Sequence, residues 1–287
     1  MITTLKHYFS LIKFSHTVFA LPFAIVGFEF AIKSGYQFEW LKFVYVLLCM
    51  VFARSAAMAF NRYIDRKFDA LNPRTKNREI PVGVISAQSA FWFVIISSLL
   101  FIVTTWFINP VCFYLSFVAL LVILGYSFTK RFTPLCHLVL GVGLSLAPIG
   151  SYLAVTGVFS TIPVLFGILV FFWVSGFDII YALQDEEFDV TNKLKSIPGY
   201  LGVKRALMVS RLLHIICATV VLYIGIKAEF GFLYWTGAVM FCALLFYQHM
   251  LVKATDLSKV NLAFATTNGI GSIIFSLFVI LDFYFNK

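Results

Sequence analysis

The sequence predicts an all-α integral membrane protein, because apolar residues dominate it and recur in runs long enough to span a bilayer. Of its 287 residues, 61% are hydrophobic and only 12% are charged. Soluble domains carry charge on about 25% of their residues. About 20 consecutive apolar residues cross the hydrocarbon core as a helix, and runs close to this length recur along the whole chain. The alternating segments of about ten residues that build a membrane β-barrel are absent.

Nine segments are expected to cross the membrane, within one domain that covers residues 1–287. In order, they span residues 16–34, 41–60, 89–108, 111–127, 134–154, 161–181, 205–226, 231–250 and 264–283. Prolines stand where helix starts or kinks are expected, at Pro22, Pro110, Pro148 and Pro163. Lys6 and Lys13 precede an apolar run without a small-residue cleavage site, so we do not expect a cleaved signal peptide.

The basic residues predict the orientation of the chain. With the N-terminus in the cytoplasm, Lys33, Lys42, Lys227 and Lys287 lie on the far side and Arg54 lies within the second span. The other 17 of the 22 Lys and Arg residues then face the cytoplasm. The positive-inside rule therefore places the N-terminus and the loops after the even-numbered spans in the cytoplasm. We expect a protein of the cell (inner) membrane.

Neither the cysteines nor the net charge of +9 predicts a further kind of site. The five cysteines, at positions 49, 112, 136, 217 and 242, lie inside apolar segments without a CxxC pair. This pattern favours small core residues over disulfides or metal ligands. In a membrane protein the positive charge sets orientation, so it does not predict nucleic-acid binding. No feature of the sequence specifies an oligomeric state.

Two acidic segments share one design, although the second begins 120 residues after the first. One reads DRKFDALNPRTKNREIP (residues 65–81) and the other DEEFDVTNKLKSIP (residues 185–198). Each begins D-x-x-F-D-x-x-N and ends with a basic residue, one further residue and Ile-Pro. Seven of the 13 acidic residues lie in them: Asp65, Asp69, Glu79, Asp185, Glu186, Glu187 and Asp189. Both follow even-numbered spans, which predicts a parallel repeat that opens on the cytoplasmic side.

In and just before these segments, polar side chains recur every four residues, a spacing that places them on one face of a helix. They are Asn61, Asp65 and Asp69 in the first set and Tyr181, Asp185 and Asp189 in the second. Asp178, seven residues before Asp185, continues the second stripe deeper into the apolar span. One such stripe is explained by solvated loop carboxylates, but two matched stripes on one side favour a shared site.

The chemistry of that site is predicted to involve magnesium and a diphosphate. Four aspartates that face one another repel unless cations lie between them. Mg²⁺ takes a few carboxylates and completes its octahedral shell with waters and substrate phosphates. Basic side chains suited to a diphosphate are Arg62, Arg66, Arg74, Lys76, Arg78, Lys130, Arg131 and Lys195. A metal-bound allylic diphosphate is a leaving group, and the carbocation it leaves needs an apolar, water-poor cavity.

These motifs resemble a known family, the UbiA superfamily of membrane prenyltransferases. Asn61-x-x-x-Asp65-x-x-x-Asp69 with the following NPRTKNREIPVG closely resembles its first aspartate-rich motif, and YALQDEEFDVTNKLKSIPGYLG resembles its second. YSFTKRFT (residues 126–133) resembles its short basic motif. IKFSHTVFALPFAIVG is similar to the first helix of the 4-hydroxybenzoate polyprenyltransferase branch and of its menaquinone-pathway relatives. The resemblance covers essentially the whole chain.

The resemblance implies nine transmembrane helices around a central cavity, with a cytoplasmic cap of loop helices. It also implies Mg²⁺-dependent transfer of an isoprenyl group from a polyprenyl diphosphate to a ring carbon of a small aromatic acceptor. By position, the metal site comprises Asn61, Asp65, Asp69, Asp185 and Asp189, with the four aspartates as catalytic residues. The diphosphate is assigned to Asn61, Arg62, Arg78, Tyr126, Lys130, Arg131 and Lys195. Gln184 precedes Asp185 where some members have lysine, which leaves the cation of the second motif open.

Three residues are assigned to the acceptor as a hypothesis: Arg54, Asp178 and Tyr181. Asp178 or Tyr181 would position the acceptor or take its proton, and the alternative for Asp178 is a hydrogen bond to a neighbouring helix. Arg54 would pair with Asp178 or bind an acceptor carboxylate. Structural roles are expected for His16 at the membrane interface, for Asn192 and Ser196 as caps, and for Asn261, Asn268 and Ser272 between helices.

The same residues argue against other functions and leave two acceptors open. A transporter would place its acidic residues near the bilayer midplane, often in inverted repeats, whereas these lie at one face in a parallel repeat. A headgroup phosphotransferase would carry a D-G-x-x-A-R signature, which is absent. Within the superfamily, the opening segment fits 4-hydroxybenzoate in ubiquinone biosynthesis and, as the alternative, a futalosine-derived precursor in menaquinone biosynthesis. It favours haem farnesylation and chlorophyll esterification less.

Overall fold

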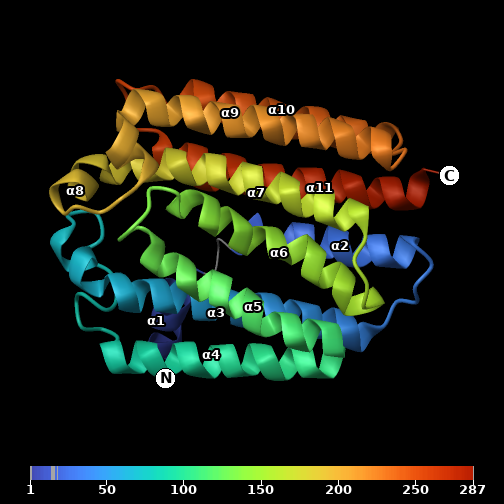
Figure 1. Ribbon diagram of the computed structural model, residues 1–287, viewed down its shortest axis with the longest axis horizontal. Helices are drawn as coiled ribbons and strands as arrows, with labels where there is room; N and C mark the ends of the chain where they lie inside the picture. Colours follow the sequence, from blue (N-terminus) through green and yellow to red (C-terminus); the bar gives the residue numbers. More distant parts are fainter. Residues whose placement is uncertain (1, 14–16, 18, 287) are drawn as a thin grey trace.

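The computed structural model describes residues 2–13, 17 and 19–286, and within them it is almost entirely helical. The long helices run side by side along the long axis of the molecule (Figure 1). In chain order the elements are α1 (Ile2–Leu11), α2 (Leu21–Lys33), α3 (Trp40–Leu71), α4 (Ala87–Ile108), α5 (Pro110–Thr129), α6 (Cys136–Thr156), α7 (Thr161–Ala182), the 3₁₀ turn η2 (Leu183–Asp185), α8 (Glu186–Thr191), α9 (Ile197–Lys227), α10 (Phe232–Leu251), the π-helix η3 (Leu262–Thr267) and α11 (Asn268–Phe285). His16, predicted to be interfacial, lies outside the described residues.

Seven helical segments are long and apolar enough to cross a membrane: α3, α4, α5, α6, α7 continued through α8, α9, and η3 continued through α11. They confirm seven of the nine predicted spans and identify an integral membrane protein. The predicted spans 16–34 and 231–250 fall on α2 and α10, which are outside this set of described helices. Helix α2 has 13 residues, fewer than the roughly 20 that a span needs, and α10 carries polar Gln248 and His249 in its last turn. Nine spans therefore remain a prediction.

Helix α7 carries the most deeply buried face of the bundle. Phe166, Trp173 and Ile179 on it are all 0% exposed. It packs against α6 and α9, and a Cβ added at Gly176 would come within 2.3 Å of the His214 ring on α9. Small residues allow such close approach of helices in membranes, where lipid gives no hydrophobic drive between them. The pattern confirms the expectation of a packed helical bundle.

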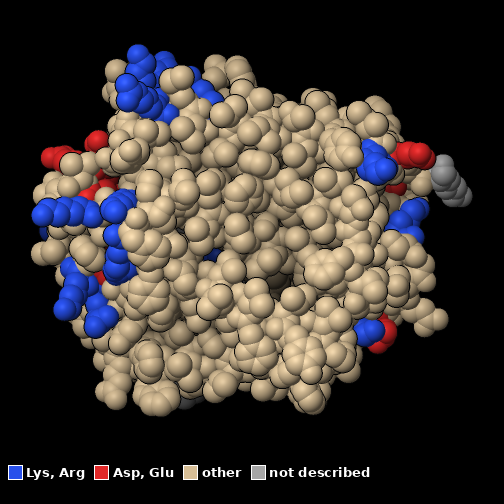
Figure 2. Space-filling model, in the orientation of Figure 1, with Lys and Arg blue, Asp and Glu red and all other residues tan. Residues whose placement is uncertain are grey.

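Apolar side chains also cover the outside of the bundle. Trp106, Leu121 and Phe246 are 64%, 76% and 69% exposed. Figure 2 shows an uncharged band across the middle of the molecule, hollowed near its centre, with charged residues gathered toward the two ends. An apolar surface of this extent is matched by lipid, because a soluble monomer rarely exposes large contiguous apolar patches.

The predictions for proline and cysteine are confirmed. Pro22, Pro110 and Pro163 lie in the first turns of α2, α5 and α7, where a missing N–H costs nothing, and Pro148 lies inside α6. All five cysteines are free, and all lie buried or half-buried.

Asn268 joins the last helix to the central helix, as predicted. Its Oδ1 accepts a hydrogen bond of 3.0 Å from Trp173 Nε1, and its Nδ2 donates to the carbonyls of Ala263 and Phe264, both at 3.0 Å. Those carbonyls lie in the π-helix η3, where the usual helical pairing is altered. By contrast, Asn261 is exposed and makes no side-chain cap. Ser272 donates within its own helix, to Gly269 O at 3.0 Å.

We therefore expect Asn268→Ala to destabilise the protein by about 1 kcal/mol, because the buried Trp173 N–H loses its acceptor. Unfolding of the purified protein by SDS in mixed micelles, followed by tryptophan fluorescence, measures this change. Asn261→Ala is the matched control and should leave the midpoint unchanged. Equal midpoints for Asn268→Ala and the parent protein would contradict the bridging role.

Candidate active site

The acidic segments meet at one end of the bundle. There the C-terminal turns of α3, the loop 72–86, the turn between α5 and α6, and α8 with the loop after it lie together, at the left of Figure 1. The same end carries a dense mixture of basic and acidic side chains in Figure 2. The fold therefore brings together four segments that are distant in the sequence.

Helix α3 positions the first acidic segment. Its 32 residues span about 48 Å, well beyond the roughly 30 Å of a bilayer core, so its last turns extend past the apolar band. Asn61 Nδ2 donates to Asp65 Oδ2 at 3.1 Å, which confirms that these two residues share a face. After the helix, Thr75 Oγ1 donates to the Asp69 carbonyl at 3.1 Å, and this turn brings Arg78 back onto the Asp69 carboxylate.

The second segment differs from the prediction of one continuous helical stripe. Helix α7 ends at Ala182, the 3₁₀ turn η2 follows, and α8 begins at Glu186. The tighter turn shifts Asp185 and Asp189 away from the ideal four-residue register. Asp189 is fully buried and accepts 2.7 Å from Ser196 Oγ, while Ser196 also caps α9 at Gly199 N. Asn192 Nδ2 donates to Phe188 O at 2.9 Å, so the capping roles of Asn192 and Ser196 are confirmed.

Each of the four aspartates forms an ion pair with its own cation. The pairs are Asp65–Arg131 at 2.9 Å, Asp69–Arg78 at 2.6 Å, Asp185–Arg74 at 2.5 Å and Asp189–Lys130 at 2.7 Å. Arg74 belongs to the loop of the first segment but binds the aspartate of the second, with Asn72 Nδ2 on the same carboxylate at 2.9 Å. The two repeats therefore form one site with four negative and four positive side chains.

Lys130 and Arg131 span the two repeats. These neighbours, on the turn after α5, pair with Asp189 of the second repeat and Asp65 of the first. Lys195 lies beside them: its N–H donates to the Lys130 carbonyl at 2.6 Å and its Nζ to the Phe132 carbonyl at 3.2 Å. The structure thus brings Lys130, Arg131 and Lys195 together, with Lys195 bound to carbonyls rather than to a carboxylate. Arg66, also predicted for the diphosphate, instead donates to the Tyr63 carbonyl at 2.6 Å.

Electrostatics keeps the bridging cations charged. Burial by itself lowers the pKa of Arg74 and of Lys130, but the adjoining carboxylates of Asp185 and Asp189 outweigh it and raise both pKa values above their usual range. Arg74 and Lys130 are therefore positively charged at neutral pH, and each remains opposite its carboxylate.

Two buried polar atoms of the site have neither a hydrogen bond nor an ion pair among the described residues. They are Asp69 Oδ2 and Arg62 Nε, on side chains that are 8% and about 5% exposed. A buried carboxylate oxygen and a buried guanidinium nitrogen are costly when unpaired. The first suits a cation and the second an anion, and carboxylate with amide oxygens is a donor set that suits Mg²⁺. Within the described part of the chain, however, no three acidic, histidine or cysteine side chains already converge as a metal cluster.

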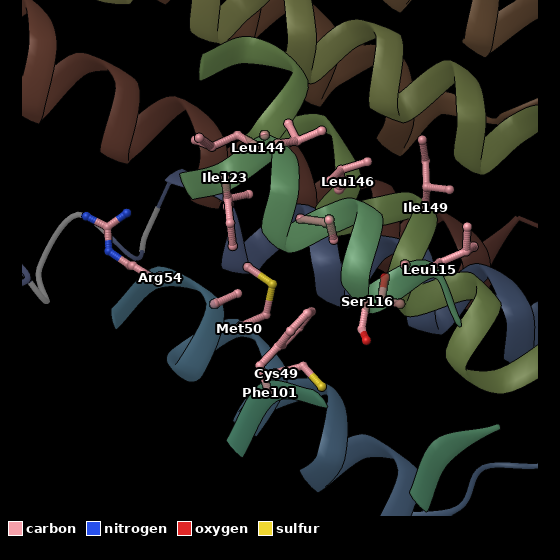
Figure 3. Close-up of a pocket in the computed structure, with 18 of the residues that line it drawn as sticks. Cys49, Met50, Arg54, Phe101, Leu115, Ser116, Ile123, Leu144, Leu146 and Ile149 are labelled. Carbon is pink, nitrogen blue, oxygen red and sulfur yellow. The ribbon is translucent and has the colours of Figure 1, made fainter. Parts of the chain in front are cut away.

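An apolar cavity of about 380 Å³ lies between α3, α4, α5 and α6. Along α5 it reaches from Tyr126 to Cys112, about 21 Å of helix. Figure 3 shows Arg54 at one side of it and Ser116 and Ile149 toward the other. Arg54 Nη2 donates to the Lys13 carbonyl at 3.2 Å. The cavity therefore runs from polar residues near the acidic site into the apolar interior.

The suggested pairing of Asp178 with Arg54 is wrong. Asp178 Oδ2 lies 2.7 Å from Nδ1 of His137, a residue in the first turn of α6 that sequence reasoning missed. Its only signal was its position just after the basic motif, which does not reveal a partner on α7. Tyr181, also assigned to the acceptor, instead accepts from Arg74 Nη1 at 2.9 Å and stacks on Phe264 with ring centroids 4.1 Å apart.

Comparison with known proteins identifies the family to which this sequence and fold belong. Residues 20–275 match the UbiA prenyltransferase family. The chain is 31% identical over 223 residues to the 4-hydroxybenzoate octaprenyltransferase of Tolumonas auensis, covering 78% of each chain. It is 31% identical over 237 residues to that of Francisella tularensis subsp. mediasiatica, covering 80% of this chain and 81% of the relative.

Solved structures agree with the sequence matches. The apo structure of a UbiA homolog from Aeropyrum pernix K1 superposes with a TM-score of 0.83 and 32% identity, over 93% of this chain and 98% of the other. A UbiA homolog from Archaeoglobus fulgidus bound to GPP and Mg²⁺ shares the fold, with a TM-score of 0.78 and 23% identity over 97% and 99% of the two chains. The chain therefore belongs to the UbiA prenyltransferase family and is a membrane-embedded prenyltransferase.

Proposed function

We propose that this chain transfers a polyprenyl group from its diphosphate to a ring carbon of 4-hydroxybenzoate, in ubiquinone biosynthesis. The observation that carries the proposal is the joining of the two acidic repeats by Lys130 and Arg131, beside an apolar cavity. The relatives named above support the acceptor, and the A. fulgidus homolog bound to GPP and Mg²⁺ supports the donor and the metal. The family match favours this activity over a transporter or a headgroup phosphotransferase.

The residues present fit a magnesium-diphosphate complex. Mg²⁺ would be held by Asn61, Asp65, Asp69, Asp185 and Asp189. When bound, it supplies Lewis-acid stabilisation of the charge that develops on the departing diphosphate. The site has equal numbers of carboxylates and cations in its ion pairs, so a nearly neutral magnesium-diphosphate unit enters without a large excess charge.

The basic residues would contact the diphosphate. With Mg²⁺ bound to the carboxylates, Arg78, Lys130 and Arg131 would be free of their present partners. They would then be available to phosphate oxygens, together with Asn61, Arg62, Tyr126 and Lys195. Arg62 Nε is buried in the site and has no partner in the part of the chain that the structure describes. Such cations stabilise the leaving group most where water is excluded.

The cavity would hold the prenyl chain and protect the allylic cation from water. Its walls are almost entirely apolar, with Arg54 and Tyr126 near its polar end. Arg54 would bind the carboxylate of the acceptor, with Asp178 and Tyr181 near its ring. We further propose that residues 1–287 form one domain of the inner membrane, with the N-terminus and the site on the cytoplasmic side.

A product assay tests the proposal. Purified protein in detergent or lipid is incubated with geranyl diphosphate, 4-hydroxybenzoate and Mg²⁺, and products are detected by mass spectrometry. We expect prenylated 4-hydroxybenzoate, and we expect EDTA to abolish it, because without metal the aspartates stay paired with the cations that the diphosphate needs. Product that persists in EDTA would refute the metal site. Magnesium-dependent diphosphate binding without product would refute 4-hydroxybenzoate and favour the futalosine-derived acceptor.

A further inference from the structure

The pair of His137 and Asp178 lies within the bundle, apart from the four ion pairs. Asp178 stands on α7 between Phe177 and Ile179, which are 2% and 0% exposed, yet its own side chain is 21% exposed. The Asp178 carboxylate is therefore only partly covered by protein atoms, unlike its two neighbours on the helix. Tyr126 is close enough to Asp178 to interact with its charge, and Tyr126 also lines the apolar cavity.

The hydrogen bonds fix the role of each nitrogen of His137. The backbone N–H of Ile197 can only donate, and it points to Nε2 at 3.4 Å, so Nε2 is the acceptor. Nδ1 then carries the hydrogen and donates to Asp178 Oδ2 at 2.7 Å. His137 is 3% exposed, so its ring is held by packing as well as by these two bonds. Within the described residues, this is the hydrogen bond that orients Asp178.

His137 also connects Asp178 to the diphosphate end of the site. Ile197, its second partner, follows Ser196, whose hydroxyl binds Asp189. The preceding Cys136 Sγ lies 3.7 Å from the Lys195 carbonyl. The loop that closes the second acidic segment therefore sets the position of the ring, and the ring sets the position of the carboxylate.

We propose that Asp178, oriented by His137, accepts the proton that the aromatic acceptor loses, an inference that rests on the proposed function. The C–O bond of the allylic diphosphate breaks, and its electron pair leaves with the diphosphate. A π-electron pair of the ring forms the new C–C bond, and the proton on the attacked carbon passes to the Asp178 carboxylate, which restores aromaticity. Asp178 is then a catalytic residue and His137 a positioning residue, since a base needs an orienting partner.

Two variants at His137 separate orientation from packing. His137→Leu removes the donor to Asp178, whereas the side-chain amide of His137→Asn replaces Nδ1–H at a similar reach. We expect His137→Leu to lower kcat about 10- to 100-fold, as loss of orienting partners does, with little change in the KM for geranyl diphosphate. We expect His137→Asn to recover most of this loss.

An isotope effect reports directly on proton removal. Turnover is compared between unlabelled 4-hydroxybenzoate and 4-hydroxybenzoate deuterated on the ring. For the parent protein and for His137→Asn, the ratio of the two kcat values should be near 1. His137→Leu and Asp178→Asn should show a primary isotope effect, because proton loss becomes rate-limiting. His249→Leu is the control: it removes the half-buried partner whose Nε2 lies 2.8 Å from His214 Nδ1, outside the site. It should show the same isotope effect as the parent protein.

The outcomes distinguish the two proposals. A parent protein that makes no prenylated aromatic product refutes the proposed function itself. An active parent with a fully active His137→Leu variant and no isotope effect refutes only the pair. If His137→Leu does not fold, the isotope effect in Asp178→Asn decides, and its absence in a folded, slow variant also overturns the proposal.

Discussion

Replacing Asp69 or Asp185 by asparagine is expected to lower prenyl transfer at least about 100-fold while the protein stays folded. Asparagine keeps the volume but removes the charge that pairs with the cation and that would hold the metal. Metal stabilisation of a leaving group contributes several kcal/mol, and each 1.36 kcal/mol corresponds to a tenfold change in rate. The partner cations Arg78 and Arg74 are 21% and 29% exposed, so water solvates them when the carboxylate is lost. Product formation by mass spectrometry measures the effect.

Folding and charge are controlled separately in this experiment. Size-exclusion chromatography and the thermal transition in detergent should match those of the parent protein. Glu187→Gln removes an acid from the same segment, on an exposed side chain outside the four ion pairs, and should retain full activity. A folded double variant, Asp69→Asn with Asp185→Asn, that kept normal turnover would refute the shared metal site.

The first acidic stripe was predictable because it depends only on the period of a helix. Asn61 and Asp65 do lie on one face of α3 and are hydrogen-bonded. The register of the second stripe was predicted less well, because no residue type between positions 181 and 185 indicates the 3₁₀ turn that separates α7 from α8. Such turns depend on how a helix end packs against the rest of the protein.

The partners of the aspartates were not predictable. Arg74 reaches Asp185 across 111 positions of sequence, and His137 reaches Asp178 across 41. Such contacts depend on which loops and helices pack together, which periodicity and composition do not encode. Charge limited the possible partners of each aspartate to basic residues, and packing decided which of them lies close enough to bind. Arg54 therefore donates to a backbone carbonyl and does not pair with Asp178.

Replacing Lys130 or Arg131 by methionine is expected to lower kcat/KM for the diphosphate by about 100- to 1000-fold. Each is one of two neighbouring cations that join the repeats, and each has a carboxylate partner that metal would occupy in the working enzyme. Removing one donor of charge stabilisation from a water-poor site typically costs this much. Initial rates at varied geranyl diphosphate concentration, with saturating 4-hydroxybenzoate, measure the change.

The matched controls separate local charge from net charge. Lys204→Met removes an exposed cation of α9, outside the ion pairs, and should leave kcat/KM unchanged. Lys130→Arg keeps the charge and should recover part of the activity. If Lys130→Met and Arg131→Met stayed within about twofold of the parent, these cations would only neutralise Asp189 and Asp65. The site would then need another source of positive charge, because burying a diphosphate opposite four unpaired carboxylates is strongly unfavourable.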